Sequence, residues 1–360
     1  MSEVESASDV SVVSDVTESV VEAIAKVVVG KDVLVRDVLA ALLSAGHVLF
    51  EDVPGLGKTL LAGSIASCLG LDFARLQFTP DLLPGDITGG YVLNPESGHF
   101  ELRKGPIFTN VLLADEINRA SPKTQSALLQ AMQEGTVSIE GSTFTLPRPF
   151  FVMATQNPVE YEGTFPLPEA QLDRFIMKCA MGYPSREQEQ QVLRNRRARG
   201  RDEARVDAVT DAESLERALA ATEQVHVSDD LDAYIVDLVA ATRSQRGVSV
   251  GASPRGSLAL LKLARVRAAQ AGRAFVIPDD ITHFAQSALA HRLVLSPDLW
   301  ARPGAAARVV EGALQAIAVP VLGDEVVEDA EGGGQGSAGD APQAGGDTAP
   351  SHARPSGERQ

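Results

Sequence analysis

The sequence predicts an α/β domain with a parallel sheet, followed by an all-helical domain. Two observations lead to this class. Up to about Gly182, short apolar runs of strand length alternate with segments of helical period, as in a doubly wound sheet. From Ser185 onward, helix-start signals follow one another instead. We therefore expect four segments: a disordered acidic tail over 1–15, an α/β core over 16–183, a helical lid over 184–322 and a disordered tail over 323–360.

Composition and charge exclude several classes of protein. The chain has 360 residues, 44% of them hydrophobic, and no apolar run of the length that a membrane span needs. Of the net charge of −16, the six acids of 1–22 and the net −6 of 324–360 account for −12. The body is thus only mildly acidic, which argues against general affinity for nucleic acids. Cys68 and Cys179 lie in apolar surroundings, so we expect reduced thiols and a cytoplasmic protein without a signal peptide.

The first ordered elements are expected to be two helices. Apolar residues recur with a helical period over 16–28, and Gly30 ends that helix. A second helix is expected over about 32–45.

The stretch HVLFEDVPGLGKTLLA at 47–62 predicts a phosphate-binding loop. A buried strand, a Pro/Gly turn, Lys58-Thr59 and a helix start follow one another, as such a loop requires. Its backbone N–H groups and the helix N-terminus would bind phosphate, Lys58 would reach the β- and γ-phosphates, and the hydroxyl of Thr59 would ligate Mg²⁺. Asp52 occupies the position where the motif has its first Gly. The expected nucleotide-binding residues here are Pro54, Gly55, Leu56, Gly57, Lys58, Thr59 and Leu60.

One segment reads as an insertion, and a later one predicts a hairpin. A strand is expected over 72–78, and the residues 79–105 after it contain eight Pro and Gly residues. That segment is too long for a simple connection, so it is either a functional loop or a plain surface excursion. Residues 136–146 alternate in polarity on both sides of Glu140-Gly141, which predicts a hairpin.

A second apolar strand, beginning at Asn110, ends in Asp115 and Glu116. Asp115 would hold the Mg²⁺ shell, partly through water, and Glu116 would act as general base toward the attacking water. Ser121-Pro122 then opens a helix to about Glu134.

A third strand, over 150–155, precedes Gln156-Asn157, and another is expected over 175–180. Asn157 either orients water at the γ-phosphate or forms an Asx-turn with Pro158. The phosphate loop, the two acids and Asn157 all follow the carboxyl ends of strands, which is where parallel sheets bind ligands.

The helical part begins with capping boxes at Ser185-x-x-Gln188 and Thr210-x-x-Glu213, and Ser228 starts a further helix. Five arginines over 194–201 are read as a solvated helix end. Further helices are expected over about 254–270 and 278–290. Ser253-Pro254 caps the first of these and leaves Arg255 in its first turn, where a cation indicates either a bound anion or a surface residue.

Taken together, these motifs resemble the MoxR family of AAA+ ATPases over about residues 16–320. The most specific pieces are EDVPGLGKT at 51–59, LLADEINRASPKTQSALLQAMQEG at 112–135, MATQNPVEYEGTFPLPEAQLDRF at 153–175 and GASPR at 251–255. The resemblance implies a P-loop AAA+ core, ATP and Mg²⁺ as cofactors, and tolerance of Asp52.

The resemblance also assigns roles to residues of the matching motifs. Asn157 matches the first sensor and Arg255 the second sensor, in the lid. Arg174 matches the arginine finger that completes a neighbouring subunit's site, with Arg119 as a second interface candidate. ATP would bind between the core and the lid.

The function expected from the resemblance is Mg²⁺-dependent ATP hydrolysis by a hexameric ring that acts as a chaperone-like remodeller or maturation factor. Its partners are expected to carry a von Willebrand factor A domain. Two alternatives stay open: a DNA motor or transcription activator of the same superfamily, and a nucleotide-gated scaffold with little turnover. The first lacks a basic channel or an added DNA-binding domain in this sequence, and the second predicts damage at Glu116 or at the finger, which the sequence does not show.

Overall fold

The computed structural model describes residues 3–158, 163–300 and 302–320. The chain up to Pro320 forms one compact unit. The tail predicted over 323–360 lies outside the described residues.

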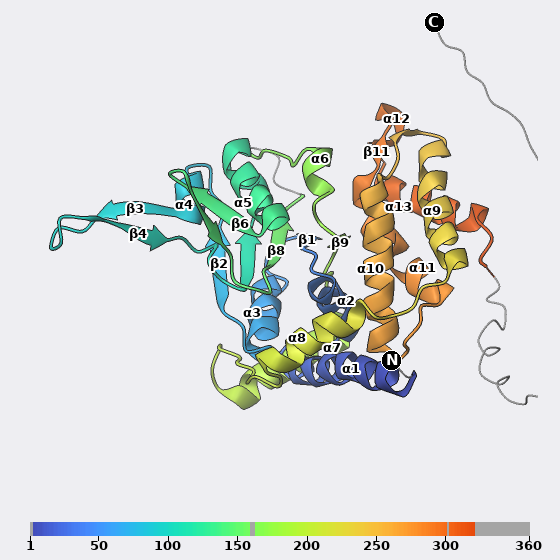
Figure 1. Ribbon diagram of the computed structural model, residues 1–360, viewed down its shortest axis with the longest axis horizontal. Helices are drawn as coiled ribbons and strands as arrows, with labels where there is room; N and C mark the ends of the chain where they lie inside the picture. Colours follow the sequence, from blue (N-terminus) through green and yellow to red (C-terminus); the bar gives the residue numbers. More distant parts are fainter. Residues whose placement is uncertain (1–2, 159–162, 301, 321–360) are drawn as a thin grey trace, which may run out of the picture. The chain divides into compact units, whose positions relative to one another are not determined.

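The centre of the fold is a five-stranded parallel sheet with the strand order β2-β5-β8-β1-β9 (Figure 1). The strands are β1 (Val48–Glu51), β2 (Phe73–Gln77), β5 (Val111–Asp115), β8 (Phe151–Gln156) and β9 (Met177–Cys179). Gln77 lies opposite Asp115, and Glu51 lies opposite Gln156. The carboxyl ends of four strands are therefore level at one edge, as the sequence predicted.

Helices cover both faces of this sheet, and the side chains of the strands alternate between two apolar clusters. Phe50 and Leu113 belong to the cluster that includes side chains of α2 (Asp32–Leu43) and α3 (Lys58–Cys68). Leu49 and Leu112 belong to the cluster that includes those of α5 (Pro122–Glu134). The strands β1, β5 and β8 are thus buried on both faces, which explains why they read as continuous apolar runs.

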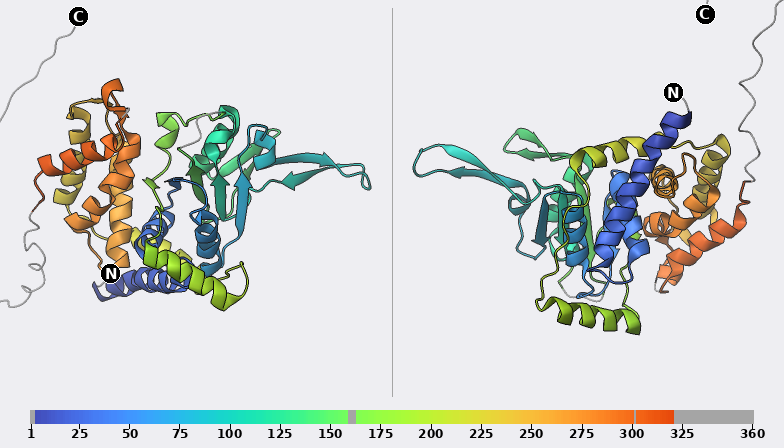
Figure 2. Two further views of the ribbon diagram at one scale, coloured as in Figure 1. Left: turned by 180° about the vertical axis from the view of Figure 1, so that it is seen from behind. Right: turned by 90° about the horizontal axis from the view of Figure 1, so that it is seen from below.

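The predicted insertion and the predicted hairpin both have secondary structure of their own. The segment 79–105 forms α4 (Pro84–Thr88) and an antiparallel arm of β3 (Gly89–Leu93) and β4 (Phe100–Lys104), which extends away from the sheet (Figures 1 and 2). The hairpin predicted over 136–146 is confirmed as β6 (Thr136–Ile139) and β7 (Ser142–Thr145). Its turn places Glu140 and Gly141 at positive φ, which explains the Gly.

The first helix, α1 (Glu3–Ala25), corrects the prediction of a disordered tail over 1–15. Val10 and Val13 are buried and continue the apolar stripe of Val20 and Ile24 toward the N-terminus. The polar, acidic composition of the segment hid this helical period. α1 packs against α3 and α2, and also against α8 (Ala212–Thr222) and α10 (Pro254–Gln270) (Figure 2).

The C-terminal part is helical, as predicted. It contains α7 (Arg186–Arg199), α8, α9 (Asp229–Ser244), α10, α11 (Pro278–Leu289), η2 (Ala290–Arg292), α12 (Pro297–Trp300) and α13 (Ala305–Ala316), with the short antiparallel pair β10 (Val248–Val250) and β11 (Val294–Leu295). The sequence did not indicate α12, α13 or this strand pair.

In the helical part, three of the predicted helix caps are confirmed and one is shifted. Ser185, Ser228 and Ser253 accept hydrogen bonds from backbone N–H groups at their helix starts. The cap of α8 is Asp211 rather than Thr210, because the Asp211 carboxylate accepts from the N–H of Ser214 at 2.7 Å.

β9 ends at Cys179 and α7 begins at Arg186, so the predicted boundary near residue 183 falls in the linker between them. The division into a core over 16–183 and a lid over 184–322 stays a prediction. Within the described ranges, no helix combines the length and the apolar character that crossing a membrane demands.

Candidate functional site

The loop between β1 and α3 has the backbone that an anion-binding loop needs. Gly55 and Gly57 have φ of 84° and 91°, a region that side chains with a Cβ rarely adopt. Gly57 caps α3 directly before Lys58, so the helix begins inside the motif. The loop therefore presents the N-terminal N–H groups of α3 at the carboxyl edge of the sheet.

Lys58 is almost completely buried, with 8% of its surface exposed. Its ammonium donates hydrogen bonds to the backbone carbonyls of Val53 at 2.9 Å and Asp52 at 3.3 Å. Burial lowers the pKa of Lys58, and the carboxylates of Asp52, Asp115 and Glu116 oppose that shift. The charge is thus held close to three acids at the edge of the sheet.

Asp115 and Glu116, at the end of β5, are both positioned by Thr155 of the neighbouring strand β8. The Thr155 hydroxyl donates to Asp115 Oδ1 at 2.6 Å and accepts from the Glu116 N–H at 2.8 Å. Glu116 has a φ of 55°, in the left-handed region that is costly for a residue with a Cβ. Thr155 thus holds the side chain of Asp115 but only the backbone of Glu116, whose left-handed φ gives its side chain a different direction.

Three further side chains, which the sequence did not single out for this site, hold the two acids. Gln77 donates to Glu116 Oε2 at 2.7 Å, and Arg75 donates to Asp115 Oδ2 at 2.7 Å. Arg119, expected as an interface candidate, is paired with Glu116 of its own chain at 2.9 Å. The available signal for Gln77 was its place at the carboxyl end of the strand next to β5.

These groups line one pocket, here called the P-loop cleft. Its lining contains Asp52, Pro54, Gly55, Leu56, Gly57, Lys58, Thr59, Leu60, Arg75, Gln77, Asp115, Glu116, Thr155, Gln156 and Asn157. Asn157 is 7% exposed, and its backbone carbonyl accepts from the Asn118 amide at 3.4 Å. The structure thus brings together every predicted P-loop residue, both acids and Asn157.

Asp52, the departure from the usual glycine, has a structural partner in the linker that follows β9. Its carboxylate accepts hydrogen bonds from the backbone N–H of Met181 and, at 3.3 Å, from that of Gly182. Lys31 donates to the carbonyl of Gly182 at 3.2 Å from the other side. Asp52 therefore ties the P-loop to the start of the helical part.

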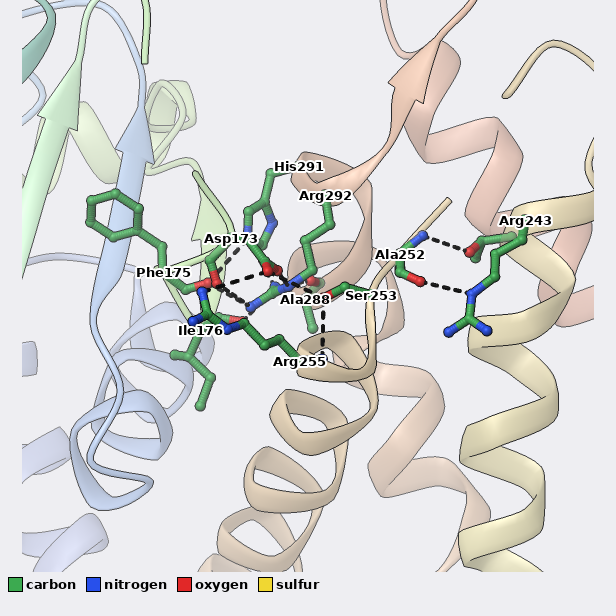
Figure 3. A network of polar contacts seen from close by, with 11 residues as sticks. Asp173, Phe175, Ile176, Arg243, Ala252, Ser253, Arg255, Ala288, His291 and Arg292 are labelled. Carbon is green, nitrogen blue, oxygen red and sulfur yellow. Dashed lines mark hydrogen bonds and ion pairs between the residues drawn. The ribbon is translucent and has the colours of Figure 1, made fainter. Parts of the chain in front are cut away.

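Arg174 and Arg255 do not line the P-loop cleft. They lie in a second pocket, here called the arginine cleft, together with Arg292 and Lys262 (Figure 3 shows Arg255 and Arg292). Arg174 donates to the carbonyl of Leu129 at 2.6 Å, and Arg255 lies 3.8 Å from Asp173.

The expectation that nucleotide binds between core and lid stays a prediction. All described residues that line the P-loop cleft belong to the range 52–157, so they come from the core alone. The helical part instead contributes cations to the arginine cleft. The likeness of Arg255 to a sensor gave no information on which cleft it occupies.

Comparisons with known proteins agree with this geometry. Residues 47–177 match the family model "ATPase family associated with various cellular activities (AAA)", and residues 240–313 match the AAA lid domain. The YeaC protein of Bacillus subtilis is 49% identical over 301 residues, covering 84% of this chain and 94% of its own length. The protein named Chaperone MoxR1 of Mycobacterium tuberculosis is 45% identical over 304 residues, covering 82% of this chain and 80% of its own length.

A solved structure has the same fold. The crystal structure of a protein from Cytophaga hutchinsonii described as an ATPase superposes with a TM-score of 0.82 at 38% sequence identity. The match covers 89% of this chain and 99% of that one.

Proposed function

Because the chain belongs to the MoxR family of AAA+ ATPases, we propose that it hydrolyses ATP with Mg²⁺ in a ring of identical subunits, as a chaperone-like remodeller. One observation carries the ring: the P-loop cleft and the arginine cleft are separate pockets of one chain. A second copy that places its arginine cleft at the P-loop cleft of the first would complete the site. Such a head-to-tail contact generates rings when its rotation closes.

The P-loop cleft fits ATP with Mg²⁺. The Thr59 hydroxyl and the Asp115 carboxylate line the same pocket as the phosphate loop. Within the described ranges no three His, Cys, Asp or Glu side chains form a metal site of their own. This suits Mg²⁺, which keeps several waters and takes its other ligands from one or two protein groups and the phosphates. Bound there, it would neutralise charge on the β- and γ-phosphates.

Three side chains of the cleft have roles in hydrolysis. Lys58 now bonds to backbone carbonyls, and its ammonium would exchange these for phosphate oxygens. Glu116 would accept the proton of the attacking water on Oε1, because Gln77 and Arg119 both donate to its Oε2. Asn157, at the tip of β8, would orient that water.

Arg174 is the better candidate for the residue that reaches a neighbour's γ-phosphate. Arg119 is paired with the general base of its own subunit, whereas Arg174 lies in the arginine cleft. Arg255 lies in the same cleft, so we assign its anion-binding role to the neighbour's nucleotide as well. With both arginines assigned to the neighbour's nucleotide, the lid of a subunit is not expected to close over the ATP of that same subunit.

Remodelling needs a surface that contacts another polypeptide. The β3–β4 arm exposes Val92, Leu93 and Phe100, at 52%, 51% and 69%. Exposed apolar side chains on a projecting arm suit contact with a protein substrate (Figure 1). The class of partner that we infer, proteins with a von Willebrand factor A domain, rests on the family alone. A cytoplasmic location fits Cys68 and Cys179, which are both free thiols.

The test is ATPase activity per subunit, measured against protein concentration. The activity of the wild type should rise with concentration as rings form, and Arg174→Ala should lower it by about 10³-fold, in the range known for arginine fingers. Arg308→Ala, which changes an exposed arginine of α13 outside both clefts, should leave it within twofold. Activity that is independent of concentration, with a tolerated Arg174→Ala, would contradict the shared site. Stimulation by DNA would favour the alternative of a DNA motor.

A further inference from the structure

The turn that presents Arg174 is held mainly by one side chain of the helical part. The turn, residues 173–176, lies between the short helix α6 (Glu169–Leu172) and β9. Four backbone bonds shape it: the N–H groups of Asp173, Arg174 and Phe175 donate to the carbonyls of Glu169, Gln171 and Leu172, and that of Ile176 donates to the carbonyl of His47. The carbonyls of the turn itself are taken up elsewhere.

Arg292, in η2, takes up those acceptors. Its Nε donates to Asp173 Oδ1 at 2.8 Å. Its two terminal nitrogens donate to the backbone carbonyls of Phe175 at 2.8 Å, Ile176 at 3.2 Å and Asp173 at 3.4 Å. Arg292 therefore contacts three of the four residues of the turn, all except Arg174 itself (Figure 3).

Because Arg292 is buried, its charge depends on these hydrogen-bond partners. Arg292 is 7% exposed, and it also donates to the carbonyl of Ala288 in α11. A buried guanidinium whose partners are removed leaves an uncompensated charge, whereas the intact pair adds little net stability. The arrangement is better suited to fixing geometry than to stabilising the fold. It fixes the turn against η2.

The carboxylate of Asp173 joins the start of α10 to the same turn. Its Oδ2 accepts from the Ser253 hydroxyl at 3.2 Å and lies 3.8 Å from Arg255. His291 adds a contact from Nε2 to the carbonyl of Phe175 at 3.1 Å. Two lid elements, the N-terminus of α10 and η2, therefore converge on the residues that flank Arg174 (Figure 3).

We propose that Arg292 is a positioning residue for Arg174, which couples the lid of one subunit to ATP hydrolysis in its neighbour. The inference rests on the proposed function, because it needs Arg174 to act on an adjacent site. When the lid of a subunit moves, Arg292 moves the turn 173–176 with it. The neighbour then gains or loses its finger. One rigid contact thus passes the state of one subunit to the next around the ring.

The test uses mixtures of two inactive proteins. Arg292→Lys keeps the charge but loses the planar fork that serves several acceptors. We expect it to lower the ATPase rate of the full-length protein at least tenfold. Glu116→Gln supplies an intact finger but no general base. If the Arg292→Lys defect lies in the finger, sites of that variant regain activity wherever their neighbour is a Glu116→Gln subunit.

Equal mixing makes about one quarter of the interfaces productive, so the mixture should reach about one quarter of the wild-type rate. Arg174→Ala mixed with Glu116→Gln is the reference, because it tests the shared site alone. Rescue in both mixtures supports the proposal. Rescue with Arg174→Ala but not with Arg292→Lys overturns it and leaves the proposed function standing. Rescue in neither overturns the shared site itself.

Two more variants separate positioning from folding. If Arg292→Lys does not fold, Asp173→Asn removes the charged acceptor and enters the same mixtures. The double variant Arg174→Ala/Arg292→Lys should be no slower than Arg174→Ala alone, since groups that act as one unit are not additive. A rate lower by a further tenfold would mean that Arg292 acts by another route.

Arg243→Lys is the matched control. Arg243 donates to the carbonyl of Ala252 at 3.0 Å, inside the helical part, and within the described part of the chain it makes no hydrogen bond to the turn 173–176 (Figure 3). Its substitution should leave the ATPase rate within twofold. A loss equal to that of Arg292→Lys would assign the effect to the stability of the lid and overturn the proposal.

Discussion

The P-loop cleft and the arginine cleft of this chain differ in what each would lack as a catalytic site. The P-loop cleft contains the phosphate loop with Lys58 and the carboxylates of Asp115 and Glu116, and the arginines Arg75 and Arg119 are paired with these two acids. The arginine cleft contains Arg174, Arg255 and Arg292 around a single acid, Asp173. The two clefts are complementary in charge, and under the proposed function each is one half of a catalytic site that two copies would complete together.

The largest effect is expected at the base. Glu116→Gln removes the proton acceptor but keeps the shape of the side chain and an oxygen that can accept from Gln77 and Arg119. The rate of hydrolysis should therefore fall by about 10²–10⁴-fold. ATP binding, measured with a fluorescent nucleotide, should change less than threefold. Arg308→Ala serves as the control for preparation. A Glu116→Gln protein that hydrolyses ATP at the wild-type rate would show that Glu116 is not the general base, and the contrast between the two clefts would then have no catalytic meaning.

A second effect is expected at β1, which lies between Gly46 of the arginine cleft and Asp52 of the P-loop cleft. His47 precedes β1, is fully buried, accepts from the Val152 N–H at 3.1 Å and contacts the Met132 carbonyl at 3.0 Å. Burial lowers its pKa to about 4. The unfolded chain, with a His pKa near 6.5, binds the proton first as pH falls, so stability is present above about pH 6.5 and is lost toward pH 4. The loss should be about 3 kcal/mol.

Urea unfolding at pH 7 and pH 4.5 measures this loss. His47→Gln keeps an acceptor and a donor but cannot titrate, so it should remove most of the His47 share of the pH dependence. Part of the pH dependence, with the same sign, should remain in this variant, because burial and Arg292 lower the pKa of His291 as well. An unchanged pH dependence in His47→Gln would show that another group, and not His47, causes the loss of stability at low pH.

The smallest effect is expected at Asp52, which connects the P-loop cleft to the linker after β9. The Met181 and Gly182 N–H groups donate to different oxygens of Asp52, so Asp52→Asn keeps one bond as a neutral one and loses the other, at a cost of at least about 1 kcal/mol. Hydrogen exchange of these two amides should therefore accelerate by about fivefold. The Val152 amide, bonded to His47, is the control. Equal rates in both proteins would show that Asp52 does not link the P-loop to the linker.

The features that the sequence predicted well are local. Lys58, Thr59 and the glycines lie within one loop, and Asp115 and Glu116 follow a recognisable strand. The sheet edge could be predicted because the carboxyl ends of parallel strands always meet.

What the sequence did not predict depends on side chains that arrive from elsewhere in the fold. Gln77 and Thr155 reach the acids across neighbouring strands, and Arg292 reaches the turn 173–176 from more than a hundred residues away. Neither spacing nor periodicity encodes such contacts. The cleft that contains Arg255 could not be predicted for the same reason. The cap of its helix depends on neighbouring residues in the sequence, whereas the cleft is formed by residues distant in the sequence.

The N-terminal helix α1 has a consequence for the synthesis of this protein. Its buried stripe packs against α8 and α10, and α8 begins only at Ala212. At about 5–20 residues per second, the ribosome needs about 10–40 seconds to make the intervening chain. During that interval Val10, Val13 and Val20 lack part of their packing surface. Completion of the fold at α1 therefore awaits the later part of the chain, and the buried valines of this helix stay partly uncovered until then.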